Sequence, residues 1–170
     1  MAQISTEVLG DERGTLLAFV ESQRAALREA AAGLTEEQAA SRPSASELSL
    51  SGLLKHVAET ELAWLRMAQQ RPNERMQGRT DWHDGFRLTE AETIPGVLAF
   101  WEGVTAELTA FVNARPSLDE TFPLPEAPWF PKDAKVSMRW LLIHLVEEFA
   151  RHAGHADILR ESIDGTKAMG

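Results

Sequence analysis

Residues 137–165 read SMRWLLIHLVEEFARHAGHADILRESIDG, and this stretch predicts one long helix. Ser137 is a good N-cap residue, and Gly165 is a good residue to end a helix. Apolar residues recur at helical spacing and are expected to face a core; they are Leu141, Leu142, Leu145, Phe149, Ile158 and Leu159. Three histidines and two adjacent acids lie within twelve residues of the same helix. The helix is therefore predicted to carry a functional site as well as a core face.

Two helices are predicted in the first half of the chain. The first covers residues 11–32, where apolar side chains recur near the helical period. The second runs to about Gln70, and either Ser49 or Ser51 can cap it. Between the two helices, Thr35 is expected to cap a short helical turn, which a loop rich in proline and serine follows.

A third helix is predicted between two long irregular segments. Thr89 with Glu92 matches a capping box that opens this helix, and the helix ends before Pro116. The preceding residues 71–88 are polar and too numerous for a tight turn, so they are expected to cross the bundle. The segment after the helix holds four prolines and cannot be helical, although residues 121–124 are suited to a brief extended stretch. The predicted fold class is all-α, a four-helix bundle.

Composition narrows the class of protein. A chain of 170 residues is expected to form one domain, residues 1–170. Its formal net charge of -9 argues against nucleic acid or an anionic membrane as a partner and favours small molecules. Residues 1–14 resemble no signal peptide and no apolar run is long enough to span a bilayer, so we expect a cytoplasmic protein. The chain has no cysteine, so any thiol chemistry must use a thiol from outside.

A row of potential metal ligands lies on the last helix. His144, Glu148 and His152 are four residues apart, which places them on one face about 6 Å from each other. A charged carboxylate such as Glu148 is costly to bury without a partner, and a divalent cation shared with two imidazoles offsets that cost. A third ligand must come from another helix. His56, within LLKHVAETELAW at residues 53–64, is the histidine flanked by apolar helix-face residues.

These residues leave more than one interpretation open. A metal can bind His56, Glu148 and His152, or it can bridge His144 and Glu148 instead. Without a metal, Glu148 and His152 form an intrahelical ion pair worth roughly 0.3 kcal/mol, and His56 is a hydrogen-bonded core residue. His83, in a loop, is expected at the surface or at a pocket rim.

The tryptophans fall into two groups. Trp64, Trp101 and Trp140 lie on predicted helices and are expected in the core. Trp82 and Trp129 lie in the long irregular segments, where we expect them to wall the mouth of a pocket that binds the thiol cofactor.

Two segments together resemble a known superfamily. LLKHVAETELAWLR at residues 53–66 and RWLLIHLVEEFARHAGHADILRESIDG at residues 139–165 resemble the DinB-like four-helix metalloproteins, especially the actinobacterial branch associated with mycothiol. That branch includes mycothiol-dependent maleylpyruvate isomerase, in which an E-x-x-x-H pair replaces the H-x-x-x-H pair of the wider superfamily. The resemblance spans nearly the whole chain. It implies His56, Glu148 and His152 as the metal ligands, an up-down-down-up bundle and a homodimer.

The resemblance also implies a chemistry. A divalent metal, most readily zinc but also nickel, iron or manganese, is expected to bind a low-molecular-weight thiol such as mycothiol and present it to an electrophile. His155, or Glu61 on the second helix, is expected to orient ligands or move a proton. The implied enzyme is a thiol transferase or isomerase. The alternatives are a metal-dependent hydrolase and a noncatalytic stress-response or ligand-binding bundle.

Overall fold

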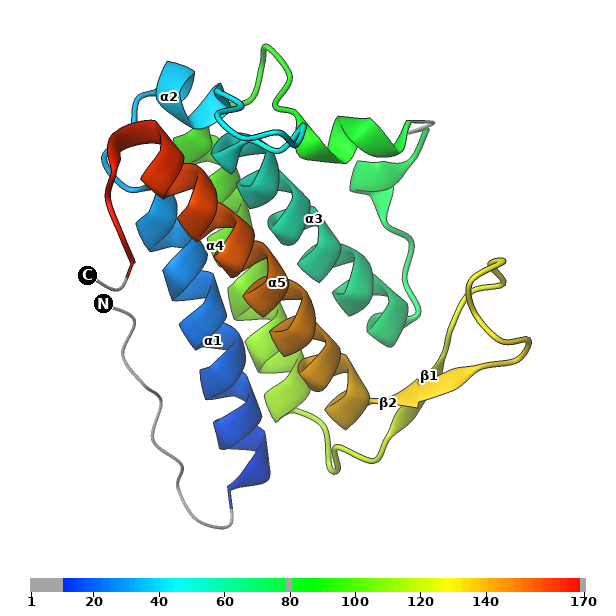
Figure 1. Ribbon diagram of the computed structural model, residues 1–170. Helices are drawn as coiled ribbons and strands as arrows, with labels where there is room; N and C mark the ends of the chain where they lie inside the picture. The colour runs from blue at the N-terminus through cyan, green and yellow to red at the C-terminus, as the bar shows by residue number, and fades with distance from the viewer. Residues whose placement is uncertain (1–10, 79–80, 169–170) are drawn as a thin grey trace.

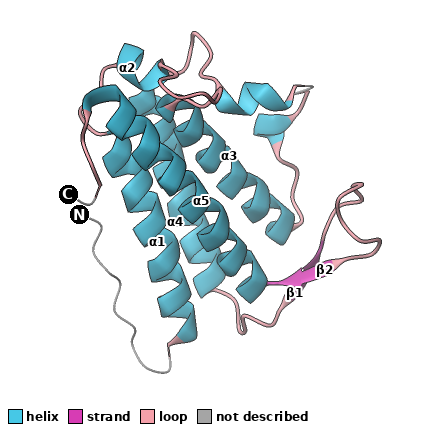
Figure 2. Cartoon of the chain, in the orientation of Figure 1, coloured by secondary structure: helices cyan, strands magenta, loops and turns pink. Residues whose placement is uncertain are grey.

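The computed structural model describes residues 11–78 and 81–168, without the side chain of Trp82. Four long helices lie side by side (Figure 1), namely α1 (Glu12–Ala31), α3 (Leu50–Gln69), α4 (Ile94–Asn113) and α5 (Met138–Asp164). The short α2 (Glu36–Ala40) begins at a capping box built on Thr35, as predicted. Helix makes up most of the described chain (Figure 2), so the predicted arrangement of four long helices is confirmed.

The helices begin and end at the residues that favour such boundaries. The hydroxyl of Ser49 accepts a hydrogen bond of 3.2 Å from the backbone N–H of Gly52, so Ser49 rather than Ser51 caps α3. Ser137 caps α5, and Gly165 ends it in the left-handed conformation at φ 78°, both as predicted. These boundaries are local, because each depends on a side chain within three residues of the helix end.

The start of α4 differs from the prediction. Thr93 caps this helix, whereas Thr89 and Glu92 were expected to do so. The backbone N–H of Thr89 does donate to the Glu92 carboxylate at 2.9 Å, but in a turn that precedes the helix. Lys55 of α3 binds the same carboxylate at 2.7 Å. The helix begins at Ile94, which places Pro95 in the first turn, where the missing N–H of proline is tolerated.

The crossover between α3 and α4 folds back along α3. It contains two 3-10 turns, η1 (Glu74–Met76) and η2 (Trp82–Phe86), and it climbs beside α3 in Figure 1. η2 comes very close to α3, because a Cβ atom added to Gly52 would lie 2.0 Å from the carbonyl oxygen of Phe86. Only glycine allows this approach of two backbones.

A short hairpin joins α4 to α5. β1 (Thr121–Pro123) pairs antiparallel with β2 (Lys135–Ser137), with Phe122 opposite Val136. The extended stretch predicted near residue 121 is therefore confirmed, while its partner strand was not foreseen. Ser137 both ends β2 and caps α5, so the hairpin fixes the place where α5 starts.

The core lies where α5 packs against α1 and α3, and where α3 packs against α4. Trp101 and Phe149 are fully buried and meet edge to face, with ring centroids 5.9 Å apart. Trp64 and Trp101 are buried as predicted, but Trp140 is 38% exposed and Ile158 is 61% exposed. Those two core predictions were wrong. Helical spacing identifies a face of α5, but burial also needs a neighbour that covers each position, which spacing does not specify.

Two predictions concern the chain ends and membranes. Within the described residues, no helix is both long enough and apolar enough to cross a membrane. The expectation that the chain begins without a signal peptide falls on residues 1–14, most of which lie outside the described residues.

Candidate metal centre

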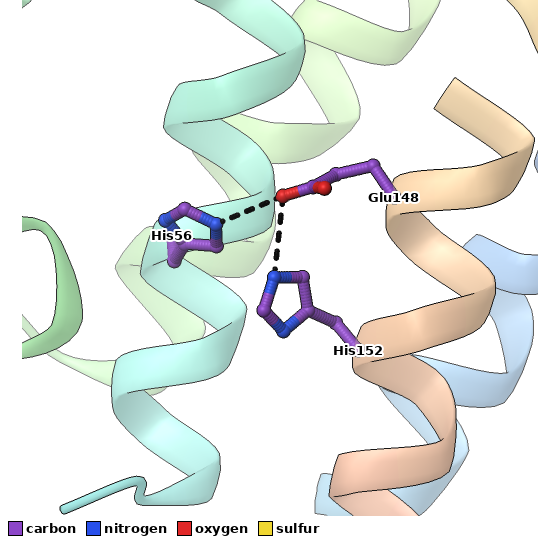
Figure 3. A group of neighbouring side chains, drawn as sticks. All are labelled: His56, Glu148 and His152. Carbon is purple, nitrogen blue, oxygen red and sulfur yellow. Dashed lines mark hydrogen bonds and ion pairs between the residues drawn. The ribbon is translucent and has the colours of Figure 1, made fainter. Parts of the chain in front are cut away.

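Three side chains converge between the two helices α3 and α5. His56 comes from α3, and Glu148 and His152 come from α5 (Figure 3). The Nε2 atoms of His56 and His152 each lie 3.2 Å from Oε1 of Glu148. One ligand atom from each residue lies within 4.8 Å of the others. The structure thus brings together the three residues that were predicted to share a metal.

The chain holds each of these side chains in place. The four-residue spacing sets Glu148 and His152 on one face of α5, and the packing of α3 against α5 brings His56 opposite them. The ring of Phe86 stacks on the ring of His56 with centroids 4.0 Å apart and an angle of 16°. Gly52 lies one turn before His56, and the close approach of η2 at Gly52 brings the Phe86 ring against His56. Sequence reasoning missed Phe86, because nothing in the spacing of the crossover points to α3.

The Glu148 carboxylate is held in its charged form. Hydrogen bonds from His152 and His56 lower the pKa of Glu148 far below its usual range, although burial opposes this shift. The side chains of the three residues are 16%, 8% and 10% exposed for Glu148, His56 and His152 respectively. An ionised carboxylate in such a place needs compensating charge or strong hydrogen bonds.

The donor set and its spacing fit a divalent cation. Two imidazoles and one carboxylate form a common set for catalytic zinc, and the same set suits iron, nickel and manganese. Ligand atoms about 2.0 Å from zinc at tetrahedral angles lie roughly 3.3 Å apart. The two separations of 3.2 Å that involve Glu148 match this value, and the ligand nitrogens of the two imidazoles lie within 4.8 Å of each other. Three protein ligands also leave a position for a substrate atom.

Arg151 is a second residue that the sequence reasoning missed. Its Nη1 atom lies 3.6 Å from Oε2 of Glu148, and its Nη2 atom lies 3.0 Å from Oε1 of Glu147. Glu147 is exposed, as expected. The signal for Arg151 was available, since it follows Glu148 by three residues on the same helix. Its positive charge lies at the solvent side of the cluster.

The two residues predicted to move protons or orient ligands occupy different surroundings. The Nδ1 atom of His155 lies 3.4 Å from Nδ1 of His152, so His155 borders the cluster. Burial lowers the pKa of His155, and the nearby His152 adds to this effect. Glu61 instead is fully buried in a network with Arg24 and Trp101. The structure does not bring Glu61 into the group of close ligand atoms found among the described residues.

The alternative pairing of His144 with Glu148 is not what the structure forms. Among the described residues, the group that can share a metal includes His152 and not His144. The His144 ring stacks on Trp140, with centroids 4.9 Å apart and an angle of 11°. Its Nδ1 atom lies 3.6 Å from Oε2 of the exposed Glu147.

The remaining predicted residues lie around the bundle. His83 is exposed at the rim of a hollow of about 210 Å³ beside Phe86, in agreement with its expected place. Trp129 is 76% exposed in the loop between β1 and β2, and its role in binding a cofactor stays a prediction. The prediction for the side chain of Trp82 lies outside the described residues.

Comparison with known proteins identifies the family. The sequence model of the mycothiol-S-transferase family matches residues 15–165. The chain belongs to this family. Membership in the mycothiol-S-transferase family confirms the predicted resemblance to a mycothiol-associated branch. No curated protein matches the chain.

Two solved structures share the fold of this mycothiol-S-transferase family member. A conserved protein from Enterococcus faecalis is 15% identical, with a TM-score of 0.64 over 91% of this chain and 98% of that chain. YfiT from Bacillus subtilis is 14% identical, with a TM-score of 0.65 over 92% of this chain and 90% of that chain. YfiT is described as a probable metal-dependent hydrolase with an unusual four-helix bundle topology. At these identities the similarity establishes the fold alone.

Proposed function

We propose that the chain transfers mycothiol to an electrophilic carbon at a divalent metal held by His56, Glu148 and His152. The observation that carries this proposal is the convergence of one ligand atom from each residue within 4.8 Å. Membership in the mycothiol-S-transferase family suggests that the thiol is mycothiol. The absence of cysteine agrees with a sulfur that arrives on a cosubstrate.

In this proposal the metal provides positive charge and the protein provides the ligands that hold it. A bound zinc, nickel, iron or manganese ion supplies the positive charge that favours a thiolate over a thiol at neutral pH. Glu148 and the two imidazoles hold that charge between α3 and α5. In the transfer, the cosubstrate sulfur forms a bond to the electrophilic carbon, the leaving group departs with its bonding electron pair, and the thiol proton passes to a base or to solvent.

Of the two residues predicted to assist, His155 is the better placed. It borders the cluster through His152, and its lowered pKa favours a neutral ring that can accept the thiol proton. Both carboxylate oxygens of Glu61 are already bound by Arg24 and Trp101, so Glu61 is assigned a structural role instead.

The test combines metal content with thiol consumption. The wild-type chain should hold close to one metal ion per chain by elemental analysis and should consume mycothiol with a panel of electrophiles. The His152→Ala variant is the control and should lose both properties. Thiol consumption by the wild type no faster than by this variant would refute the proposal.

A hydrolase is the second candidate, because the fold relative YfiT is described as a probable metal-dependent hydrolase. Turnover of an ester or amide without any thiol, lost in His152→Ala, would favour it. A chain that binds no metal and shows no thermal shift with zinc, nickel or manganese would favour a noncatalytic bundle.

The architecture carries two further proposals. We infer that residues 1–170 form one domain with the four long helices in up-down-down-up order, and what supports this order is the crossover that climbs beside α3 in Figure 1. The homodimer implied by the resemblance also stays a proposal. Light scattering coupled to size-exclusion chromatography tests it directly, since a dimer has twice the 18.8 kDa mass of the chain.

A further inference from the structure

Aromatic rings continue the row of metal-ligand candidates along α5. Trp140, His144, Glu148 and His152 follow each other at intervals of four residues. Trp140 and His144 stack nearly parallel, with centroids 4.9 Å apart and an angle of 11°. Trp64 of α3 meets both rings, with its centroid 5.3 Å from that of Trp140 and 4.6 Å from that of His144. Here too, α3 and α5 bring their side chains together.

The hairpin loop adds a fourth ring to this group. Phe130 lies 6.4 Å from Trp64, centroid to centroid and roughly edge to face. Phe130 also lines a hollow of about 710 Å³ at the loop between β1 and β2, together with Leu124 and four prolines. We call Trp64, Phe130, Trp140 and His144 the aromatic cluster.

The side chains of the aromatic cluster differ in how much of their surface is exposed to solvent. Trp64 is 8% exposed and belongs to the core, whereas Trp140 is 38% exposed. A partly open indole beside a stacked imidazole offers apolar area that another flat ring can cover. Because four residues of helix rise about 6 Å, a ring seated against His144 and Trp140 lies within one to two turns of Glu148.

From this placement we propose that the aromatic cluster binds the electrophile, and that the electrophile is a neutral, electron-poor aromatic compound such as a nitroaromatic halide. This inference rests on the proposed thiol transfer. Electron-poor rings stack favourably on the electron-rich face of indole. The formal net charge of -9 disfavours an anionic substrate. Glu148 follows His144 by one helical turn, so an electrophile on the aromatic cluster would lie beside the proposed metal site.

Turnover with two electrophiles tests the proposal in the full-length, metal-loaded chain. One electrophile is 1-chloro-2,4-dinitrobenzene, whose ring carbon bonds to the thiol sulfur while chloride leaves with the bonding pair and the proton passes to buffer. The other is iodoacetamide, which has no ring. Trp140→Leu should lower kcat/KM for the aromatic electrophile about tenfold and change that for iodoacetamide less than twofold. Trp140→Phe, which keeps an aromatic ring, should retain most of the wild-type kcat/KM for the aromatic electrophile.

The matched control is Ile143→Ala, since Ile143 is a 51% exposed apolar residue of the same helix outside the aromatic cluster. It should leave the ratio of the two kcat/KM values unchanged. An equal fall for both electrophiles in Trp140→Leu would indicate a structural role and overturn the proposal, as would no change. Trp140→Phe keeps a ring in place, so the comparison survives if Trp140→Leu fails to fold.

Binding without thiol separates this proposal from the proposed function. The probe is the unreactive 2,4-dinitrotoluene, measured by equilibrium dialysis against wild type, Trp140→Leu and His152→Ala. Binding about tenfold weaker in Trp140→Leu, with His152→Ala like wild type, supports the aromatic site even if no thiol transfer is found. Equal binding by wild type and Trp140→Leu overturns it even if thiol transfer is found.

Discussion

Glu61 and Glu148 are two carboxylates inside the same bundle, and their partners differ. Glu61 has no exposed surface, and Arg24 holds both of its oxygens at 3.0 Å and 2.5 Å. Trp101 donates a further hydrogen bond of 2.7 Å to one of them. Glu148 keeps 16% of its side chain exposed, and one of its oxygens is hydrogen-bonded to the imidazoles of His56 and His152. The exposed Arg151 lies farther away, 3.6 Å from the other oxygen.

The difference separates a structural cluster from a chemical one. A guanidinium is permanently charged and has no lone pair to give to a metal, so the cluster around Glu61 offers a metal no nitrogen ligand. An imidazole nitrogen can bind a proton or a metal ion, so the site around Glu148 can change its occupant. A buried carboxylate therefore indicates function only when its partners can exchange what they bind.

The largest effect is expected from a change in the Glu148 cluster. His152→Ala removes one of three ligands, so it should lose the bound metal and about 100-fold or more of the thiol-transfer rate. The bundle should stay folded, because the network around Glu61 is untouched. Elemental analysis, the rate and far-UV circular dichroism check these outcomes together. A variant that retains both metal and rate would remove the distinction between the clusters.

The Glu61 cluster should respond in stability instead. Glu61→Ala removes the fully buried counter-ion of Arg24, leaves it only the half-exposed Glu21 at 3.1 Å, and should lower the free energy of unfolding by about 3–5 kcal/mol in urea titrations. The folded fraction should still hold metal. Replacing both partners, Arg24→Met with Glu61→Leu, should cost much less, because no uncompensated charge remains. A loss of metal from folded Glu61→Ala would link the two clusters and contradict their separation.

Gly52→Ala should disturb the Glu148 cluster from outside. The added Cβ atom would lie 2.0 Å from the carbonyl oxygen of Phe86, so η2 must move away from α3. The Phe86 ring would then lose its stack on His56. We expect a loss of about 1–3 kcal/mol in stability and roughly tenfold weaker metal binding by calorimetry. Gly103→Ala is the control, since a Cβ there meets nothing within 4 Å. Equal metal affinities for the two variants would contradict a role for the stack.

In the metal-free chain, lowering the pH should remove the stability that the hydrogen bonds of the Glu148 carboxylate contribute. Because the folded-state pKa of Glu148 lies below the ordinary glutamate value of 4.5, the charged carboxylate stabilises the fold above about that pH. The contribution is lost as the pH falls through the lowered folded-state pKa. The stability difference between wild type and Glu148→Gln should therefore shrink as the pH is lowered from 6 toward 3. A constant difference in urea titrations would show that the hydrogen bonds contribute nothing.

The smallest effect is expected beside the cluster. Glu147 and Arg151 form an i, i+4 ion pair whose side chains are 60% and 56% exposed. Glu147→Gln should change the free energy of unfolding by less than about 0.5 kcal/mol in urea titrations, because solvent screens such a pair. A loss above 1 kcal/mol would mean that Arg151 depends on Glu147 to hold Glu148.

Local features of the sequence predicted much of the fold. Ser137 and Gly165 mark the ends of α5 because a cap acts within a few residues of a helix end. Thr89 and Glu92 also matched a local pattern and do form its hydrogen bond, but in a turn that precedes the helix. The error arose because a helix that started at Thr89 would hold Pro95 in its interior, where proline is disfavoured.

The candidate site was predictable to a similar degree. The four-residue spacing placed Glu148 beside both His144 and His152, and the apolar neighbours of His56 pointed to that residue on the second helix. The family resemblance then selected His152 over His144. Phe86 and the Arg24 partner of Glu61 were not predictable, because both pairings depend on how the crossover and α1 pack against α3. Periodicity shows which face of a helix is used, but not which residue of another segment will meet it.

The origin of the three ligands on two helices has a consequence for the abundance of the protein. An ion shared by α3 and α5 would join distant segments of a cysteine-free chain, as a disulfide does elsewhere. Free metal at 100 times its Kd would add about 2.7 kcal/mol to the stability of the folded state. Unfolded chains are removed by proteases, so metal scarcity would reduce the number of protein molecules as well as the fraction that holds metal.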